Sequence, residues 1–328
     1  MTATPDESQR LLREGACARL VDRDAVIVRG SDARSWLQGQ LSQDLDPLEP
    51  GGSAETLVLS PQGKIDAACR VTVIAAEVVL LDTEPGYGDQ LAVRLRRFRL
   101  RVRAELESGT VRCLSIRGPL ATVAGITGAP PPGTVAPVAR EGAAASWLDG
   151  SWAVTVRAEW PGFAGLDVLG PPGGPIGPVW PVEGLVEGDA GAFEAARIEA
   201  GVPLIGRELG ERTIPQEAGA LVEHAVSFTK GCYTGQELVA RLDARGGNVA
   251  KRLRGCVLGT EAEVPEIGTE LEVEGREVGR LTSAAWSPGF GRPVALAYVR
   301  RDVVPPAHAE LAGGLGGVEI RELPLTIN

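Results

Sequence analysis

The chain of 328 residues has little histidine and no paired-cysteine motif, and both absences narrow the chemistry open to it. Two histidines exclude a multi-histidine metal centre and argue against Ser-His-Asp catalysis. The cysteine count is odd and no Cys-x-x-Cys occurs, which fits a reducing compartment and argues against a disulfide framework or a standard zinc site. We therefore expect no metal site. The cysteines are Cys17, Cys69, Cys113, Cys232 and Cys256.

Net positive charge and long apolar runs are also missing. The formal net charge is −10, which argues against a dedicated nucleic-acid binder, and we expect no direct DNA binding. No apolar run approaches the length that spans a membrane, and residues 1–10 are polar, unlike a secretory signal. We expect a cytoplasmic protein without a membrane partner. The length predicts two or three domains.

Lysine is scarce as well, and one of the three lysines opens the most informative segment, Lys230-Gly231-Cys232-Tyr233-Thr234-Gly235-Gln236-Glu237. Thr234 and Glu237 have the spacing of a capping box, and the apolar residues that follow have helical spacing. Cys232 should therefore lie just before a helix N-terminus. There the helix dipole and Lys230 would favour the thiolate. The alternative is that Cys232 is a small buried hydrophobe.

Periodicity predicts several other elements. Residues 190–200 read as a helix that ends at Gly201, and 18–20 with 25–28 read as a hairpin. Strict alternation over 99–107 predicts a half-buried strand. Six arginines fall between Arg94 and Arg103, which predicts either an anion site or a solvated charged face. Short strands and turns after residue 246 suggest a small closed or sandwiched β-domain.

Six ordered segments of this sequence together resemble the YgfZ family, folate-binding relatives of the aminomethyltransferase (T-protein) of the glycine cleavage system. The resemblance spans nearly the whole chain, and Lys-Gly-Cys-Tyr-x-Gly-Gln-Glu is its most specific part. The segments are Trp36–Leu45, Leu59–Asp66, Arg197–Gly206, Thr213–Ala218, Lys230–Glu237 and Gly279–Arg300.

The resemblance implies an α+β fold, a three-domain aminomethyltransferase-like ring with a C-terminal β-barrel. Residues 1–245 would form the folate-binding region, as two interleaved subdomains (1–50 with 140–245, and 51–139). Residues 246–328 would form the barrel.

The resemblance also implies a cofactor, partners and site residues. The cofactor would be tetrahydrofolate or a derivative, and the partners would be iron–sulfur proteins or their assembly factors. Cys232 would be the functional thiol, with Lys230 beside it and the motif residues Gly231, Tyr233, Gly235, Gln236 and Glu237 around it. Glu199 and Arg197 would bind folate, or form an internal ion pair. Asp82 and Lys64 are further candidates for folate contacts, although Asp82 could instead be a turn residue and Lys64 a solvated lysine. Asp66 is the remaining candidate for a folate contact.

One departure from the aminomethyltransferase pattern concerns catalysis. Those enzymes carry two consecutive acidic residues after the glycine turn, whereas this chain has Asp66 followed by Ala67. Because Ala67 cannot transfer a proton, we expect no standard aminomethyltransferase chemistry. Asp66 should lie on the opposite strand face from residue 67.

Three functions stay open at this point. The first is a tetrahydrofolate-binding accessory protein for the maturation or repair of iron–sulfur enzymes, including those that modify tRNA. The second is a tetrahydrofolate-dependent one-carbon transferase. The third is a structural interaction module, which requires Lys230 and Cys232 to be buried. A single cysteine cannot hold a cluster alone, since clusters generally have four ligands.

Overall fold

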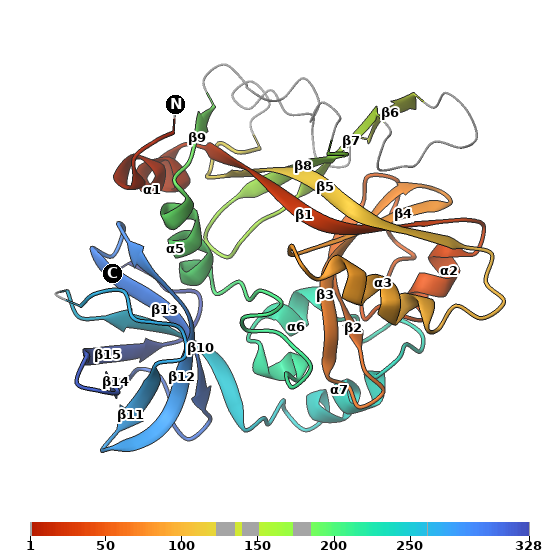
Figure 1. Cartoon of the computed structure of the whole chain (residues 1–328). Coiled ribbons are helices and arrows are strands. Elements are labelled where there is room, and N and C mark those ends of the chain that lie inside the picture. The colour runs from red at the N-terminus through yellow and green to blue at the C-terminus, as the bar shows by residue number, and fades with distance from the viewer. Residues whose placement is uncertain (1, 123–134, 140–150, 173–184, 261, 328) are drawn as a thin grey trace.

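The computed structural model (Figure 1) describes residues 2–122, 135–139, 151–172, 185–260 and 262–327. The helices are α1 (Pro5–Glu14), α2 (Ala33–Gln38), α3 (Gly88–Arg96), α5 (Ala190–Ala200), α6 (Leu221–Ala225) and α7 (Gln236–Asp243), with the 3-10 helix η2 (Pro215–Glu217). The strands are β1 (Cys17–Arg29), β2 (Ser53–Leu59), β3 (Ile65–Ala75), β4 (Val78–Thr83), β5 (Glu105–Arg117), β6 (Val135–Ala139), β7 (Ser151–Arg157), β8 (Gly165–Gly170), β9 (Val186–Glu187), β10 (Lys251–Leu258), β11 (Glu270–Val273), β12 (Arg276–Ser287), β13 (Arg292–Arg300), β14 (Ala307–Leu311) and β15 (Gly316–Arg321).

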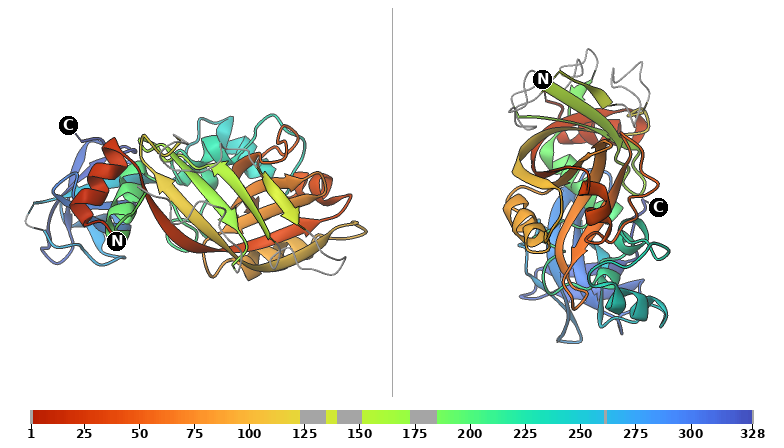
Figure 2. Two further views of the ribbon diagram at one scale, coloured as in Figure 1. Left: turned by 90° about the horizontal axis from the view of Figure 1, so that it is seen from above. Right: turned by 90° about the vertical axis from the view of Figure 1, so that its right-hand side faces the viewer.

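A nine-stranded sheet occupies one end of the molecule (Figure 2). Its strand order is β2-β3-β4-β1-β5-β8-β7-β6, and β9 pairs in parallel with β1. The sheet curls on itself: Arg70 of β3 donates to Asp167 of β8 at 2.7 Å, although β4, β1 and β5 lie between these strands in the sheet. Strand twist accumulates in this direction over many strands. The curl encloses a buried cluster that includes Ile27, Leu80 and Val154.

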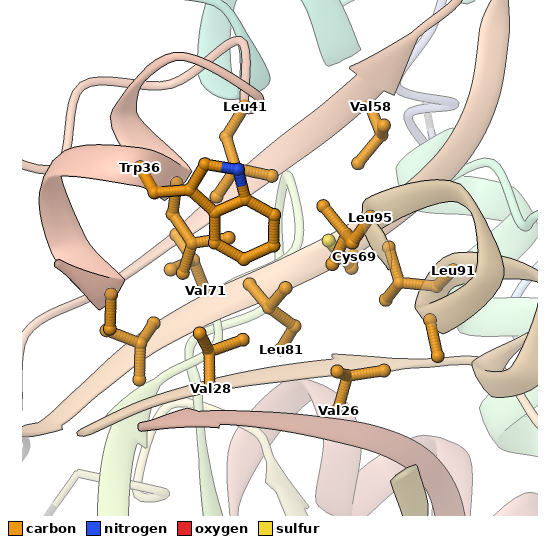
Figure 3. Packing of buried hydrophobic residues seen from close by; sticks show 14 of the residues in the cluster. Val26, Val28, Trp36, Leu41, Val58, Cys69, Val71, Leu81, Leu91 and Leu95 are labelled. Atoms are coloured by element: carbon orange, nitrogen blue, oxygen red, sulfur yellow. The ribbon is translucent and has the colours of Figure 1, made fainter. Parts of the chain in front are cut away.

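The other face of the sheet is covered by α2 and α3. Figure 3 shows the buried residues there, with the Trp36 indole packed among the aliphatic side chains of β1, β3 and β4. Leu91 and Leu95 reach the same cluster from α3. The Trp36 indole N–H donates to the carbonyl of Phe98 at 3.3 Å, so its one polar group is satisfied inside the core. Burial of this apolar face fixes both helices on the sheet.

The C-terminal strands close into a barrel in the order β10-β13-β12-β11-β14-β15. The predicted α+β class with a C-terminal β-barrel is therefore confirmed. Helix α5 packs on the barrel, where Ala195 and Ile198 join a cluster with Leu253 and Leu296. Asp189 caps α5 by accepting from Ala192 N–H at 2.9 Å, and Gly201 ends it at φ 75°. The helix predicted for 190–200 is thus confirmed. The division of 1–245 into two subdomains stays a prediction.

Two predicted elements are wrong. Residues 18–20 and 25–28 belong to one continuous strand, β1, because the charged residues between them find tertiary partners. Arg23 pairs with Asp82 and Glu84, and the Asp24 carboxylate accepts from the N–H groups of Gly86 and Gly88 at 2.9 Å each. The strand predicted over 99–107 begins only at residue 105.

Candidate functional site

The segment Lys230–Glu237 forms the turn between α6 and the start of α7. Helix α7 begins at Gln236, and its N-cap is Gly235 with φ 83° and no side-chain cap hydrogen bond. The predicted capping box of Thr234 and Glu237 is therefore wrong. Instead the Gln236 side chain accepts from the Tyr233 N–H at 2.9 Å. Glu237 is exposed and pairs with Arg241 one helical turn on.

Gly235 lets this turn pack on the hairpin between β2 and β3. A Cβ at Gly235 would lie 2.4 Å from the Ser60 carbonyl oxygen, and a Cβ at Gly63 would lie 2.6 Å from Leu238 Cβ. Both glycines also have positive φ, which disfavours other residues. The motif turn and the glycine turn of Leu59–Asp66 therefore meet backbone to backbone. Gly231, in contrast, is exposed, and a Cβ added there would have no atom within 4 Å.

The Lys230 ammonium lies among backbone carbonyl groups after α2. Its Nζ donates to the carbonyl oxygens of Gln38 (2.7 Å), Leu41 (2.9 Å) and Gln43 (2.7 Å), and lies 3.3 Å from Gln38 Oε1. Burial lowers the pKa of Lys230 to about 8, with Asp44 and Asp46 acting in the opposite direction. The motif lysine thus joins Lys230–Glu237 to Trp36–Leu45, two segments far apart in the sequence.

Further contacts fasten the same two segments together. The Ser227 N–H donates to the Ser42 carbonyl at 2.9 Å, and the Thr234 N–H donates to the Gly39 carbonyl at 3.3 Å. Gly39 is the C-cap residue of α2. Tyr233 packs against an apolar cluster, and burial raises its pKa to about 12. The residues around Cys232 are therefore held on both sides.

Cys232 is the one exposed cysteine of the five. The others lie in the core, where burial raises the pKa of Cys17 and of Cys256 to about 12. Burial also raises the pKa of Cys69 and Cys113. Since the thiolate is the reactive form, these four are inert, whereas Cys232 is accessible from solvent. The alternative that Cys232 is a buried hydrophobe is wrong; its preference for thiolate stays a prediction.

Glu199 and Arg197 lie at the contact between α5 and the barrel, away from the motif turn in the fold. The Ser287 hydroxyl donates to Glu199 Oε1 at 2.5 Å, and Arg13 of α1 pairs with the other oxygen. Burial raises the pKa of Glu199, against these two partners. Arg197 pairs with Glu194 and donates to Ser283 Oγ at 2.7 Å. These are the contacts of an internal ion-pair network, the alternative left open by the sequence.

Asp82 is fully buried inside the curled sheet. It accepts from Arg23 Nε at 2.5 Å and from two nitrogens of Arg70 at 3.0 Å each. Arg70 and Arg117 in turn both pair with Asp167. Burial alone would raise the pKa of Asp167, but these two guanidinium groups overcome it and lower the pKa well below its usual range. Asp82 is therefore no turn residue but part of a buried charge network.

Asp66 lies at an irregularity of β3, where Val58 pairs with Ala67 and Leu59 pairs with Ile65. This β-bulge directs Asp66 toward α3, where Arg94 Nε donates to its Oδ2 at 2.7 Å. Ala67 packs in the cluster that holds Leu91 and Leu95 of α3. The prediction that residues 66 and 67 lie on opposite faces is wrong, because the bulge breaks the alternation. Lys64 is exposed at the hairpin tip.

The arginines between 94 and 103 divide into two groups. Arg94 is buried and forms an ion pair with Asp66, and Arg103 forms an ion pair with Asp32. The others are exposed, and within the described part of the chain none forms an ion pair with a carboxylate; they are Arg96, Arg97, Arg99 and Arg101. Both interpretations, an anion site and a solvated face, stay open.

Sequence reasoning missed the residues that hold the site together. The carbonyls of Gln38, Leu41 and Gln43 are main-chain groups, so no residue type signals them. Arg13 and Ser287 come from segments distant in sequence from α5. Gly39 was the one available signal for a close backbone approach, because a glycine within a helical pattern is costly and suggests that another segment lies against it.

Comparison with known proteins agrees with this architecture. Residues 251–323 match the family described as the glycine cleavage T-protein C-terminal barrel domain. The aminomethyltransferase T of the glycine cleavage system from Bartonella henselae superposes with a TM-score of 0.76 at 21% identity, covering 98% of this chain and 89% of that one. The protein therefore has the aminomethyltransferase fold with a T-protein-type barrel.

Curated relatives narrow the class further. The tRNA-modifying protein YgfZ of Klebsiella pneumoniae is 35% identical over 136 residues, which is 40% of this chain and 41% of that protein. The protein of the same name from Escherichia fergusonii is 34% identical over an equal span. An uncharacterized protein of Haemophilus influenzae is 26% identical over 81% of this chain and 82% of its own length. The chain is thus a relative of the YgfZ proteins, matching about two fifths of the length of the two that carry this name.

Proposed function

We propose that this protein binds tetrahydrofolate or a derivative and supports the maturation or repair of iron–sulfur enzymes, including enzymes that modify tRNA, with Cys232 as its functional thiol. One observation carries the proposal: Cys232 is exposed to solvent, while Lys230 and Thr234 on either side of it are hydrogen-bonded to the segment that follows α2. The curated YgfZ relatives are named as tRNA-modifying proteins, which supports the choice of partner enzymes.

The thiol would act with a partner rather than by holding a cluster itself. A cluster generally needs four ligands, and the other four cysteines are buried. In the described ranges no group of three or more histidine, cysteine or acidic side chains is placed to hold a metal ion. Among the described helices, none is long and apolar enough to cross a membrane. Cys232 would therefore contact iron or a cluster transiently, on the partner protein.

Asp66 fits the folate role better than the other acidic candidates. A pterin presents an amide-like edge, which a carboxylate with free lone pairs reads through paired hydrogen bonds. The Asp66 side chain is 23% exposed and its Oδ1 accepts no hydrogen bond from the described residues. Glu199 and Asp82 are fully enclosed and engaged by arginine. Exposed Lys64, on the same hairpin, would meet the carboxylates of the folate tail. Bound tetrahydrofolate would supply a one-carbon carrier.

Titration calorimetry with tetrahydrofolate tests this assignment. We expect binding by the wild-type protein and a loss of about tenfold or more in affinity for Asp66→Asn, since hydrogen bonds to charged groups contribute about 1.5–3 kcal/mol. Glu322→Gln, an exposed carboxylate of the barrel, is the matched control and should bind as wild type. Absence of binding by the wild-type protein would sink the folate assignment.

The second candidate function is a tetrahydrofolate-dependent one-carbon transferase, which the fold likeness favours. Proton transfer would have to come from Asp66, because residue 67 is alanine, and Asp66 is held by Arg94. We expect no turnover of an aminomethyl donor under conditions where folate binds. Measurable turnover that Asp66→Asn abolishes would favour this candidate instead.

The third candidate, an interaction module in which the motif is purely structural, requires a buried Cys232. Its exposure speaks against that role, although Lys230 is partly buried. Cys232→Ala should therefore leave the urea midpoint of unfolding unchanged and remove function. A variant that is destabilised as well as inactive would favour the module.

A further inference from the structure

The contacts of Lys230 point to a role that the motif alone does not reveal. Three backbone carbonyls, those of Gln38, Leu41 and Gln43, converge on its Nζ within 2.7–2.9 Å. An ammonium has three N–H donors and no acceptor. All three donors are therefore used on the protein, and none is left to deliver a proton to a substrate or to the Cys232 thiol.

The carbonyls belong to the end of α2 and the turn after it. Gln38 is the last residue of α2, where unpaired carbonyls and the helix dipole favour a cation. Lys230 is the cation that reaches them, and its ammonium also lies 5.4 Å from the centre of the Tyr233 ring. The Asp44 and Asp46 carboxylates are the nearby anions. This arrangement is a binding cage for an ammonium-type cation, and the protein's own lysine fills it.

We propose that Lys230 is a positioning residue, whose ammonium in the carbonyl cage of Gln38, Leu41 and Gln43 holds the turn that presents Cys232. The segment from Ser227 to Thr234 donates hydrogen bonds to residues 38–43 from three places, the Ser227 N–H, the Lys230 ammonium and the Thr234 N–H. Cys232 lies between the last two. Without the ammonium, Ser227 and Thr234 would keep their backbone hydrogen bonds to Ser42 and Gly39, but the residues between them would lose their attachment to the end of α2, and the exposed thiol would lose its fixed place. The biological meaning of this device rests on the proposed role of Cys232.

Hydrogen exchange of the turn, with chemical rescue, tests the proposal. In Lys230→Ala we expect the amides of residues 231–235 to exchange at least about tenfold faster, because local opening becomes easier. Methylammonium chloride should restore slow exchange by filling the cage, and tetramethylammonium chloride, which has no N–H donor, should not. Lys251→Ala is the matched control: that lysine also lies over a tyrosine ring, Nζ 4.3 Å from the Tyr298 centroid, but in the barrel.

Two results would overturn the proposal. One is unchanged exchange of the turn in Lys230→Ala. The other is equal rescue by the two salts, which would mean a general ionic effect. Should the alanine variant fail to fold, Lys230→Met keeps the length of the side chain without its donors and serves the same comparison. These readouts do not depend on folate or on iron–sulfur enzymes, so failure of this proposal and failure of the proposed function are distinguishable.

Discussion

At the scale of single residues, some members of the motif Lys230–Glu237 attach the turn to other segments, and others are exposed to solvent. Lys230 and Gly235 fix the turn to two other segments, and Gln236 satisfies the Tyr233 N–H. Cys232 and Gly231 remain exposed. The sequence could place a helix start here but could not separate these roles, because exposure depends on what packs against the turn. The capping box failed for a related reason: Gly235 adopts positive φ and takes the N-cap position itself.

Gly235→Ala should destabilise the protein by about 1–3 kcal/mol, since a Cβ there would meet the Ser60 carbonyl at 2.4 Å and the residue would hold positive φ. Urea unfolding measures the change. Gly231→Ala, with no atom within 4 Å of the added Cβ, is the control and should stay within about 0.5 kcal/mol of wild type. Equal effects of the two substitutions would contradict the close approach of the motif turn to the hairpin.

Thiol modification should single out Cys232. Under native conditions an aromatic disulfide reagent should react rapidly with one of the five cysteines, because the other four are buried and burial raises their pKa. The rapid phase should vanish in Cys232→Ala and persist in Cys256→Ala. Rapid reaction of two or more thiols in the folded protein would show that the core cysteines are accessible.

At the scale of elements, periodicity predicted α5, and short strands and turns predicted the C-terminal β-domain, since α5 and the barrel strands each bury one regular face. The hairpin prediction failed at β1, because Asp22-Arg23-Asp24 has the composition of a turn. In the structure Arg23 forms ion pairs with Asp82 of β4 and with Glu84, and Asp24 accepts a hydrogen bond from the N–H of Gly88 in α3. Periodicity also failed over residues 99–107, where alternation alone did not make a strand: Leu100 is 83% exposed and has no strand beside it. Tertiary pairing decides such segments.

The curl of the sheet depends on the buried network around Asp167. Asp167→Asn should cost about 3–5 kcal/mol at neutral pH, since it leaves two buried guanidinium groups partly unpaired. Asp302→Asn, which removes an exposed partner of Arg300, is the control and should leave stability close to that of wild type.

Acid should reduce the difference between wild type and Asp167→Asn. The pKa of Asp167 is lowered in the folded protein, so its stabilising contribution is complete above the unfolded value of about 3.9 and is lost as the pH falls toward the folded value. Unfolding free energies measured from pH 5 downward should therefore converge for the two proteins. A constant difference across this range would show that the carboxylate is not held by Arg70 and Arg117.

At the scale of the whole molecule, three of the segments that carry the family resemblance come together at the motif turn although they are spread along the chain. Trp36–Leu45 and Leu59–Asp66 both meet the motif turn, whereas Arg197–Gly206 meets the barrel through Arg197 and Ser283. The fold class followed from the resemblance and from barrel-type strands. The sequence could not show which acidic residues form internal ion pairs, because their arginine partners lie on other elements. Glu199 pairs with Arg13 of α1, and Asp66 pairs with Arg94 of α3.

Glu199 should prove to be a structural residue that joins α1, α5 and the barrel. Glu199→Gln should lower stability by about 1–3 kcal/mol, because Arg13 loses its buried partner while remaining 32% exposed itself. Urea unfolding measures this loss, and the affinity for tetrahydrofolate should remain that of wild type. A large loss of folate affinity in Glu199→Gln with unchanged stability would indicate that Glu199, and not Asp66, contacts the pterin.

The central claim is that a folded, folate-binding scaffold acts through the exposed thiol of Cys232. The most direct test is the level of thiomethylated tRNA nucleosides, products of iron–sulfur enzymes, in a strain that lacks this protein and expresses Cys232→Ser in its place. We predict that the variant accumulates as a folded protein yet leaves the modification at the level of the deletion strain, whereas Cys256→Ser restores it. Full restoration by Cys232→Ser would contradict the account.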